Sequence, residues 1–142
     1  MLRKYARYAL LLFVAFACLS GCAKQPQTFT LVLPANPTTG YEWSLTQTPP
    51  LLDAQSEYVP DPAAAGLAGG GGAETFLLTA NKAGETALVF TYARPWESSD
   101  SDITLTYNVK VDRRLRVTLQ SVTADVPGKV DILPEIPQPV IK

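Results

Sequence analysis

The sequence of 142 residues contains no histidine, and its two cysteines lie at positions 18 and 22. Without histidine, the chain cannot form a Ser-His or Cys-His catalytic pair, and it cannot hold a metal ion through imidazole. The absence of this one residue type excludes most hydrolytic mechanisms and the commonest transition-metal sites. We therefore predict that the protein is not an enzyme.

Two other features that often carry chemistry are incomplete. Glu97, Asp100 and Asp102 lie among serines, without the ligand spacing of a dedicated calcium loop, and we interpret them as a solvated loop. The run Gly69 to Gly72 is followed by neither a Lys-Ser/Thr pair nor a helical segment, which excludes a phosphate-binding loop. The sequence therefore predicts no metal and no cofactor.

A long apolar run occurs only near the N-terminus. Arg3, Lys4 and Arg7 precede the apolar residues 8–19, which is typical of a signal peptide and too short to cross a bilayer comfortably. The run ends in Leu-Ser-Gly-Cys, which resembles the bacterial lipobox, where cleavage precedes a cysteine that is then acylated. We expect residues 1–21 to be a signal peptide, Cys22 to carry lipid, and residues 22–27 to form a tether. The expected location is the bacterial cell envelope, at the outer membrane.

Cleavage before Cys22 would also change the charge and the cysteine content. It removes Cys18 and three of the 12 basic residues, which leaves nine against 13 acidic ones, a formal charge of −4, and no disulfide. Nucleic-acid binding requires a basic face, so this balance argues against it. We expect membrane attachment to depend on the acyl chains on Cys22.

The remaining sequence has no helical periodicity but alternates apolar and polar residues with period two, which predicts strands. The last of them carries Arg114, Arg116 and Gln120 on its outer face, a composition that suits an edge strand. Four prolines indicate that residues 124–142 are an extended tail outside the sheets. The pattern predicts an all-β sandwich over residues 28–123. The expected strands cover residues 28–33, 41–45, 52–59, 76–80, 88–92, 104–111 and 115–122.

Three loops interrupt this pattern, with the sequences NPTTG at residues 36–40, GGGG at 69–72 and RPW at 94–96. In the first, Pro37 fixes φ and Gly40 permits backbone angles that other residues avoid, so the loop should have one shape. The order and strand contexts of the three motifs resemble the signature of the chagasin family, which is NPTTG with a following hydrophobic residue and Trp, then GxGG, then RPW or RPF. The resemblance covers about residues 29–111.

The resemblance implies an immunoglobulin-like β-sandwich with the three loops at one end. It also implies a monomeric, reversible inhibitor that occludes the cleft of papain-like (cathepsin-L-like) cysteine peptidases, from the same cell or a foreign one. Tyr41 and Trp43 are expected to anchor the first loop in the core. The residues implied in peptidase binding are Asn36, Pro37 and Gly40 for the shape of the first loop, Thr38 and Thr39 over the catalytic cysteine, Gly69, Gly70, Gly71 and Gly72 on one side of the cleft, and Arg94, Pro95 and Trp96 on the other.

The sequence departs from the family in two respects and leaves alternatives open. The proline-rich tail has no counterpart in the family. Family members usually have a strand before the one that contains Phe29, whereas here an extra strand at 115–122 is expected to pair beside 104–111 and cover the edge left free. One alternative function is a surface-anchored carbohydrate- or protein-binding module with Trp96, Tyr92 and Tyr58 as an aromatic platform. Another is a purely structural lipoprotein, which leaves the three loops unexplained.

Overall fold

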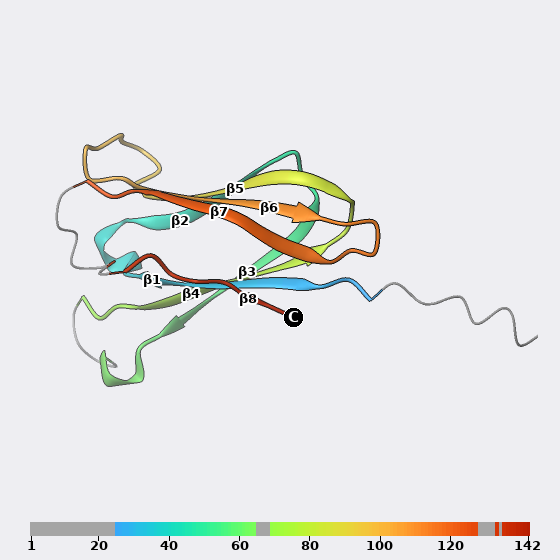
Figure 1. Ribbon diagram of the computed structural model, residues 1–142. Helices are drawn as coiled ribbons and strands as arrows, with labels where there is room; N and C mark the ends of the chain where they lie inside the picture. The colour runs from blue at the N-terminus through green and yellow to red at the C-terminus, as the bar shows by residue number, and fades with distance from the viewer. Residues whose placement is uncertain (1–24, 65–68, 128–132, 134) are drawn as a thin grey trace, which may run out of the picture.

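The computed structural model describes residues 25–64, 69–127, 133 and 135–142. The expected signal peptide and the lipid site at Cys22 lie outside these residues. The described chain folds into two four-stranded antiparallel sheets that face each other (Figure 1). Within these ranges there is no α-helix and no helix able to cross a membrane. The predicted all-β sandwich is confirmed.

Each sheet takes strands from distant parts of the chain. The first has the order β3 (Leu52–Pro60), β4 (Gly72–Ala80), β1 (Thr28–Ala35) and β8 (Val140–Ile141). The second has the order β2 (Glu42–Thr48), β5 (Gly84–Ala93), β6 (Ile103–Val111) and β7 (Val117–Asp125). Two short 3₁₀ turns, η1 (Pro37–Thr39) and η2 (Pro62–Ala64), lie in loops between strands.

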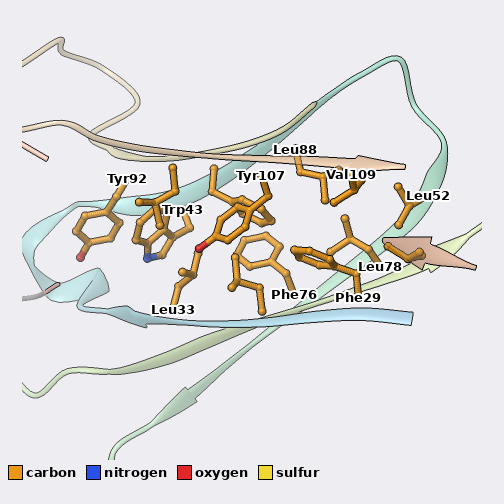
Figure 2. Close-up of a cluster of buried hydrophobic side chains, with 14 of the residues drawn as sticks. Phe29, Leu33, Trp43, Leu52, Phe76, Leu78, Leu88, Tyr92, Tyr107 and Val109 are labelled. Carbon is orange, nitrogen blue, oxygen red and sulfur yellow. The ribbon is translucent and has the colours of Figure 1, made fainter. Parts of the chain in front are cut away.

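The alternating apolar residues of these strands form one core between the sheets. Phe29, Leu31 and Leu33 of β1 are completely buried, and so is Tyr107 of β6 on the facing sheet. The ring of Tyr107 packs edge-on against Phe29 at 5.8 Å and against Phe90 at 5.7 Å, which joins the two sheets at the centre of the sandwich (Figure 2). Burial of such large aromatic groups is the main favourable term holding the sheets together.

The strand register gives the sandwich two distinct ends. Ala35 pairs with Gly72 and Glu42 pairs with Ala93, so the loops that follow or precede these residues gather at one end, which we call the loop end. Thr28 pairs with Thr79 and Gly84 pairs with Val111, so the chain enters the domain at the other end, the base. Figure 1 shows the two groups of loops at opposite ends of the strands.

The C-terminal part of the chain extends both sheets. β7 pairs antiparallel with β6 and forms the edge of its sheet, as predicted for the extra strand. The expectation that residues 124–142 stay outside the sheets is wrong, because β7 continues to Asp125 and β8 pairs with β1 at Phe29 and Thr30. Pro127, Pro137 and Pro139 lie outside β7 and β8, so they remove no donor from the ladder.

Candidate functional site

Asn36 organises the loop formed by residues 36–40. Its carbonyl accepts hydrogen bonds from the Thr39 backbone N–H at 3.1 Å and from the Thr39 hydroxyl at 2.7 Å. Its side-chain Oδ1 accepts the hydroxyl of Thr38 at 2.6 Å. Pro37 is the first residue of the 3₁₀ turn, where a fixed φ suits the backbone. Both threonine side chains are exposed at the tip, but their hydroxyls are already engaged within the loop.

Gly40 closes this turn and supports a tryptophan from another loop. It has φ of 82°, in the left-handed region, and its N–H donates to the Pro37 carbonyl at 3.0 Å. The indole of Trp96 lies directly over it, since a Cβ built at Gly40 would be 2.8 Å from Cη2 of Trp96. Trp96 is nevertheless 69% exposed. The two loops thus form a continuous surface whose apolar part faces outward.

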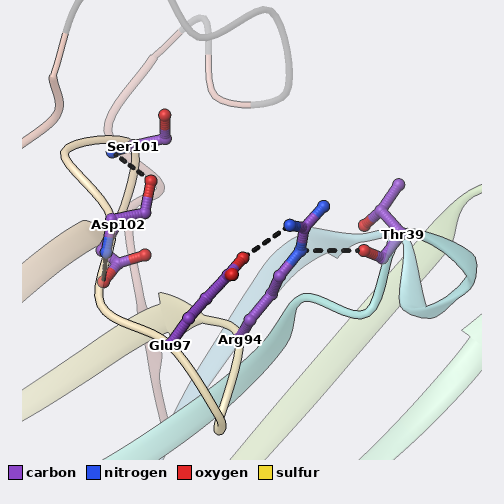
Figure 3. Close-up of polar contacts among 6 residues, drawn as sticks. Thr39, Arg94, Glu97, Ser101 and Asp102 are labelled. Atoms are coloured by element: carbon purple, nitrogen blue, oxygen red, sulfur yellow. Dashed lines mark hydrogen bonds and ion pairs between the residues drawn. The ribbon is translucent and has the colours of Figure 1, made fainter.

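Arg94 fastens the same two loops by polar contacts (Figure 3). Its Nε donates to the Thr39 carbonyl at 3.2 Å, and its Nη1 forms an ion pair with Glu97 at 2.6 Å. The guanidinium also stacks 4.8 Å from the ring centroid of Tyr41, a favourable cation–π geometry. The hydrogen bond from Arg94 to Glu97 raises the pKa of Arg94 above its ordinary value. Arg94 therefore acts chiefly inside the chain, holding the backbone of the first loop.

Buried aromatic residues attach the first loop to the core. The Tyr92 hydroxyl accepts the backbone N–H of Asn36 at 3.0 Å, and its ring lies between Tyr41 at 5.2 Å and Trp43 at 4.9 Å. Trp43 is buried and donates its indole N–H to the Pro34 carbonyl at 2.9 Å. Tyr92 and Trp43 occupy the end of the core nearest the loops (Figure 2). The predicted anchoring role of Trp43 and Tyr41 in the core is confirmed, with Tyr41 only partly buried.

The two ends of the glycine run require glycine for different reasons. Gly69 has φ of 83°, and its carbonyl accepts the side-chain amide of Asn36 at 3.0 Å, which joins the second loop to the first. Gly72 lies within β4, where a Cβ would collide with the Val59 carbonyl and lie 2.7 Å from the Tyr58 hydroxyl. Packing within its own sheet therefore explains why residue 72 is a glycine, and close approach of a partner is not needed to explain it.

The structure brings all twelve predicted binding residues to the loop end. Three direct contacts connect their loops, namely Asn36 with Gly69, Arg94 with Thr39, and Trp96 over Gly40. Sequence reasoning gave Tyr92 no role in the loops and took Glu97 only as part of an acidic loop. The signal available for Tyr92 was its position two residues before Arg94, on the buried face of a strand.

The comparisons with known proteins agree with this geometry. A sequence profile described as chagasin family peptidase inhibitor I42 matches residues 22–111. Amoebiasin-1 of Entamoeba histolytica is 38% identical over 81 residues, covering 57% of this chain and 78% of amoebiasin-1. Chagasin of Trypanosoma cruzi is 37% identical over 76 residues, covering 49% of this chain and 67% of chagasin.

The solution structure of amebosin superposes with a TM-score of 0.50 at 37% identity, covering 58% of this chain and 78% of amebosin. The expected immunoglobulin-like form of the sandwich is thereby confirmed. Because the family profile spans most of the chain, including all three loops, this chain belongs to the chagasin family, whose members are peptidase inhibitors and not enzymes.

Proposed function

We propose that this chain is a reversible, monomeric inhibitor that occludes the catalytic cleft of papain-like cysteine peptidases. The loop of residues 36–40 enters the cleft, with Thr38 and Thr39 over the catalytic cysteine. The glycine loop and the loop of residues 94–96 contact the two sides of the cleft. This assignment combines the family membership with the loop geometry of this chain.

The observation that carries the proposal is the direct connection of three loops from separate parts of the sequence. Asn36 binds the glycine loop, and Arg94 and Trp96 hold the first loop from the other side. A group of loops already fixed in one shape loses little conformational entropy on binding. A rigid loop is also a poor substrate, because it cannot adopt the extended form that a peptidase cleaves.

Neither partner needs to supply a reacting group for this kind of inhibition. The loops contain no cysteine or histidine, and the hydroxyls of Thr38 and Thr39 are bonded to Asn36. The interaction is therefore steric and reversible. A contact of standard size, roughly 800 Å² per partner, is enough for tight binding when all three loops engage together.

We further propose that the protein is held in the bacterial envelope by lipid on Cys22. The support is the apolar run that ends in Leu-Ser-Gly-Cys. Replacement of Cys22 by Ser should give an unacylated protein that no longer partitions with membranes at high salt, where attraction between charges is screened. Mass spectrometry of the wild-type N-terminus tests the same point, and a terminus without acyl chains would contradict the anchoring.

Titration into papain tests the inhibitory function directly. The domain of residues 25–142 contains the whole described core and should inhibit papain at equilibrium. It should also bind a papain variant whose catalytic cysteine is changed to alanine, measured by calorimetry, since the mechanism is steric. Loss of binding with that thiol would contradict cleft occlusion. Absence of binding to either enzyme would contradict the proposed target class.

The platform alternative receives less support from the structure. It needs exposed aromatic rings gathered on one face, but Tyr92 is only 4% exposed and its ring lies between Tyr41 and Trp43. Trp96, which is exposed, packs over Gly40 of the first loop instead. The inhibitor function accounts for these contacts and the platform does not.

A further inference from the structure

The point where the chain enters the domain is fixed by backbone hydrogen bonds to three other segments. The backbone N–H of Gln27 donates to Leu115, and its carbonyl accepts from Ala80. Its side-chain Oε1 accepts the N–H of Val117 at 2.9 Å. The next residue, Thr28, exchanges two backbone hydrogen bonds with Lys142. The end of β4, the turn between β6 and β7, and the C-terminal residues thus surround the start of β1.

Each of these three segments carries exposed basic side chains. Lys82 lies in the turn that follows β4, where its backbone N–H donates to the Leu51 carbonyl. Arg113 and Arg114 lie in the turn between β6 and β7. Arg116 follows in the same turn, and Lys142 lies beside Thr28. The side chains that form this basic end are Lys82, Arg113, Arg114, Arg116 and Lys142, and all five are exposed.

Among the described residues, the acidic side chains at the base are Asp112, Asp53 and Glu85, which are fewer than the basic ones, and each is held by a partner within the chain. The Asp112 carboxylate accepts the backbone N–H groups of Arg116 at 2.9 Å and Arg114 at 2.7 Å, which together lower its pKa. Asp53 accepts the side-chain amide of Asn81. Glu85 is paired with Lys110 at 3.0 Å. None of the five basic side chains forms an ion pair among the residues that the structure describes.

The opposite end of the sandwich is acidic. Glu42, Asp61, Glu97, Asp100 and Asp102 lie in or beside the loops there, with Arg94 paired to Glu97. A chain with an excess of acidic residues overall therefore has a positive end and a negative end, separated by the length of the strands. With eight residues in β1, that separation is about 25 Å. Such an asymmetric distribution orients a molecule near a charged surface.

We infer that the basic end binds the anionic phospholipid headgroups of the membrane to which the chain is tethered, so that the three loops point away from the bilayer. The orientation rests on the proposed anchoring at Cys22. Five residue steps separate Cys22 from Gln27, so the base lies within about 18 Å of the acylated cysteine. Because 18 Å is the fully extended length, the tether lets the basic side chains approach the bilayer to within one Debye length, about 8 to 10 Å, over which the negative surface potential extends.

Vesicle binding of residues 25–142, which lack Cys22, tests this surface separately from the lipid anchor. Vesicles containing phosphatidylglycerol should bind the domain, vesicles of phosphatidylcholine alone should not, and added salt should weaken binding. Arg113→Gln should weaken it roughly fivefold, and the triple change of Arg113, Arg114 and Arg116 to Gln about 100-fold. Lys110→Gln is the matched control and should have a smaller effect than Arg113→Gln, because Lys110 is already paired with Glu85.

Two further readouts decide orientation and fold. Tryptophan fluorescence of the bound domain should be quenched by acrylamide and not by brominated lipid, because exposed Trp96 lies at the loop end. The triple variant should unfold at the wild-type temperature and inhibit papain like wild type, which separates this inference from the proposed function. Binding independent of lipid charge, an unaffected triple variant, or quenching by brominated lipid would overturn it. So would binding to heparin without binding to anionic vesicles, which would assign this end to a soluble polyanion.

Discussion

At the scale of single residues, Gly40 meets two requirements at once, a left-handed backbone and contact with the Trp96 indole. Gly40→Ala should therefore strain the turn by about 1 kcal/mol and push the indole away from the loop. We expect inhibition of papain to weaken at least about tenfold, while the thermal midpoint falls by only the few degrees that such strain implies, because the core is untouched. Thr39→Ala is the control, since it removes one hydroxyl and keeps the backbone. Equal inhibition by both variants would contradict this role of Gly40.

Tyr92 is a positioning residue that no partner needs to touch. Its hydroxyl accepts the Asn36 N–H, and its ring packs within the core. Tyr92→Phe keeps the ring and leaves that N–H without its acceptor, at a cost of about 1 kcal/mol. Because the loop then has more freedom before binding, the dissociation rate should rise several-fold with little change in association rate. Stopped-flow and competition kinetics measure both rates, and unchanged dissociation would show that Asn36 is held sufficiently by its other bonds.

At the scale of elements, the glycine run divides into a loop part and a strand part. Gly72 packs against the Val59 carbonyl and the Tyr58 hydroxyl, so Gly72→Ala should destabilise the pairing of β3 with β4 by about 1 to 3 kcal/mol. A Cβ at Gly69 would have nothing within 4 Å, so this position needs only its positive φ, which asparagine tolerates. Gly69→Asn should unfold at the wild-type temperature.

Urea unfolding and papain titration of the two glycine variants distinguish stability from binding. Gly72→Ala should lower the free energy of unfolding. Under conditions where this variant is folded, it should inhibit papain like the wild type. Gly69→Asn should keep stability and lose affinity, because its side chain projects where the partner approaches. The reverse pattern would place the partner contact at Gly72 instead.

At the scale of the whole molecule, Tyr107 connects both sheets to the C-terminal segment. It is completely buried, and its hydroxyl donates to the Pro137 carbonyl at 2.7 Å. Burial raises its pKa from 10.0 to about 12. Because the folded state favours the neutral phenol, the stabilising contribution is fully present below pH 10 and is lost as pH rises from about 10 to about 12.

Tyr107→Phe should remove this part of the pH dependence. At neutral pH the variant should be less stable by about 1 kcal/mol, the value of a typical hydrogen bond. Towards pH 12 the difference should shrink and then reverse, since phenylalanine has no proton to lose. Denaturant unfolding of both proteins across this range measures the difference. Parallel stability curves for the two proteins would show that Tyr107 has the same pKa in the unfolded and folded states.

The sequence by itself determined strands β1 to β7, apart from their exact ends, and the face that each of them buries. Alternation with period two places side chains on opposite faces of a strand, so Phe29, Leu31 and Leu33 had to lie together on the buried face. It also marked the three loops, and in the first of them Pro37 fixes φ while Gly40 permits a left-handed backbone, each through its own covalent structure. These properties depend on neighbouring residues, and a sequence displays neighbours directly.

Only the tertiary structure decided which distant residues meet. The hydrogen bonds from Asn36 to Tyr92 and from Arg94 to Thr39 join residues more than 50 positions apart, and the pairing of β8 with β1 joins the two ends of the described domain. The same holds for Gly72, whose lack of a side chain is explained by a carbonyl on the adjacent strand. Such contacts follow from the register of paired strands and the packing of two sheets, which no local pattern specifies.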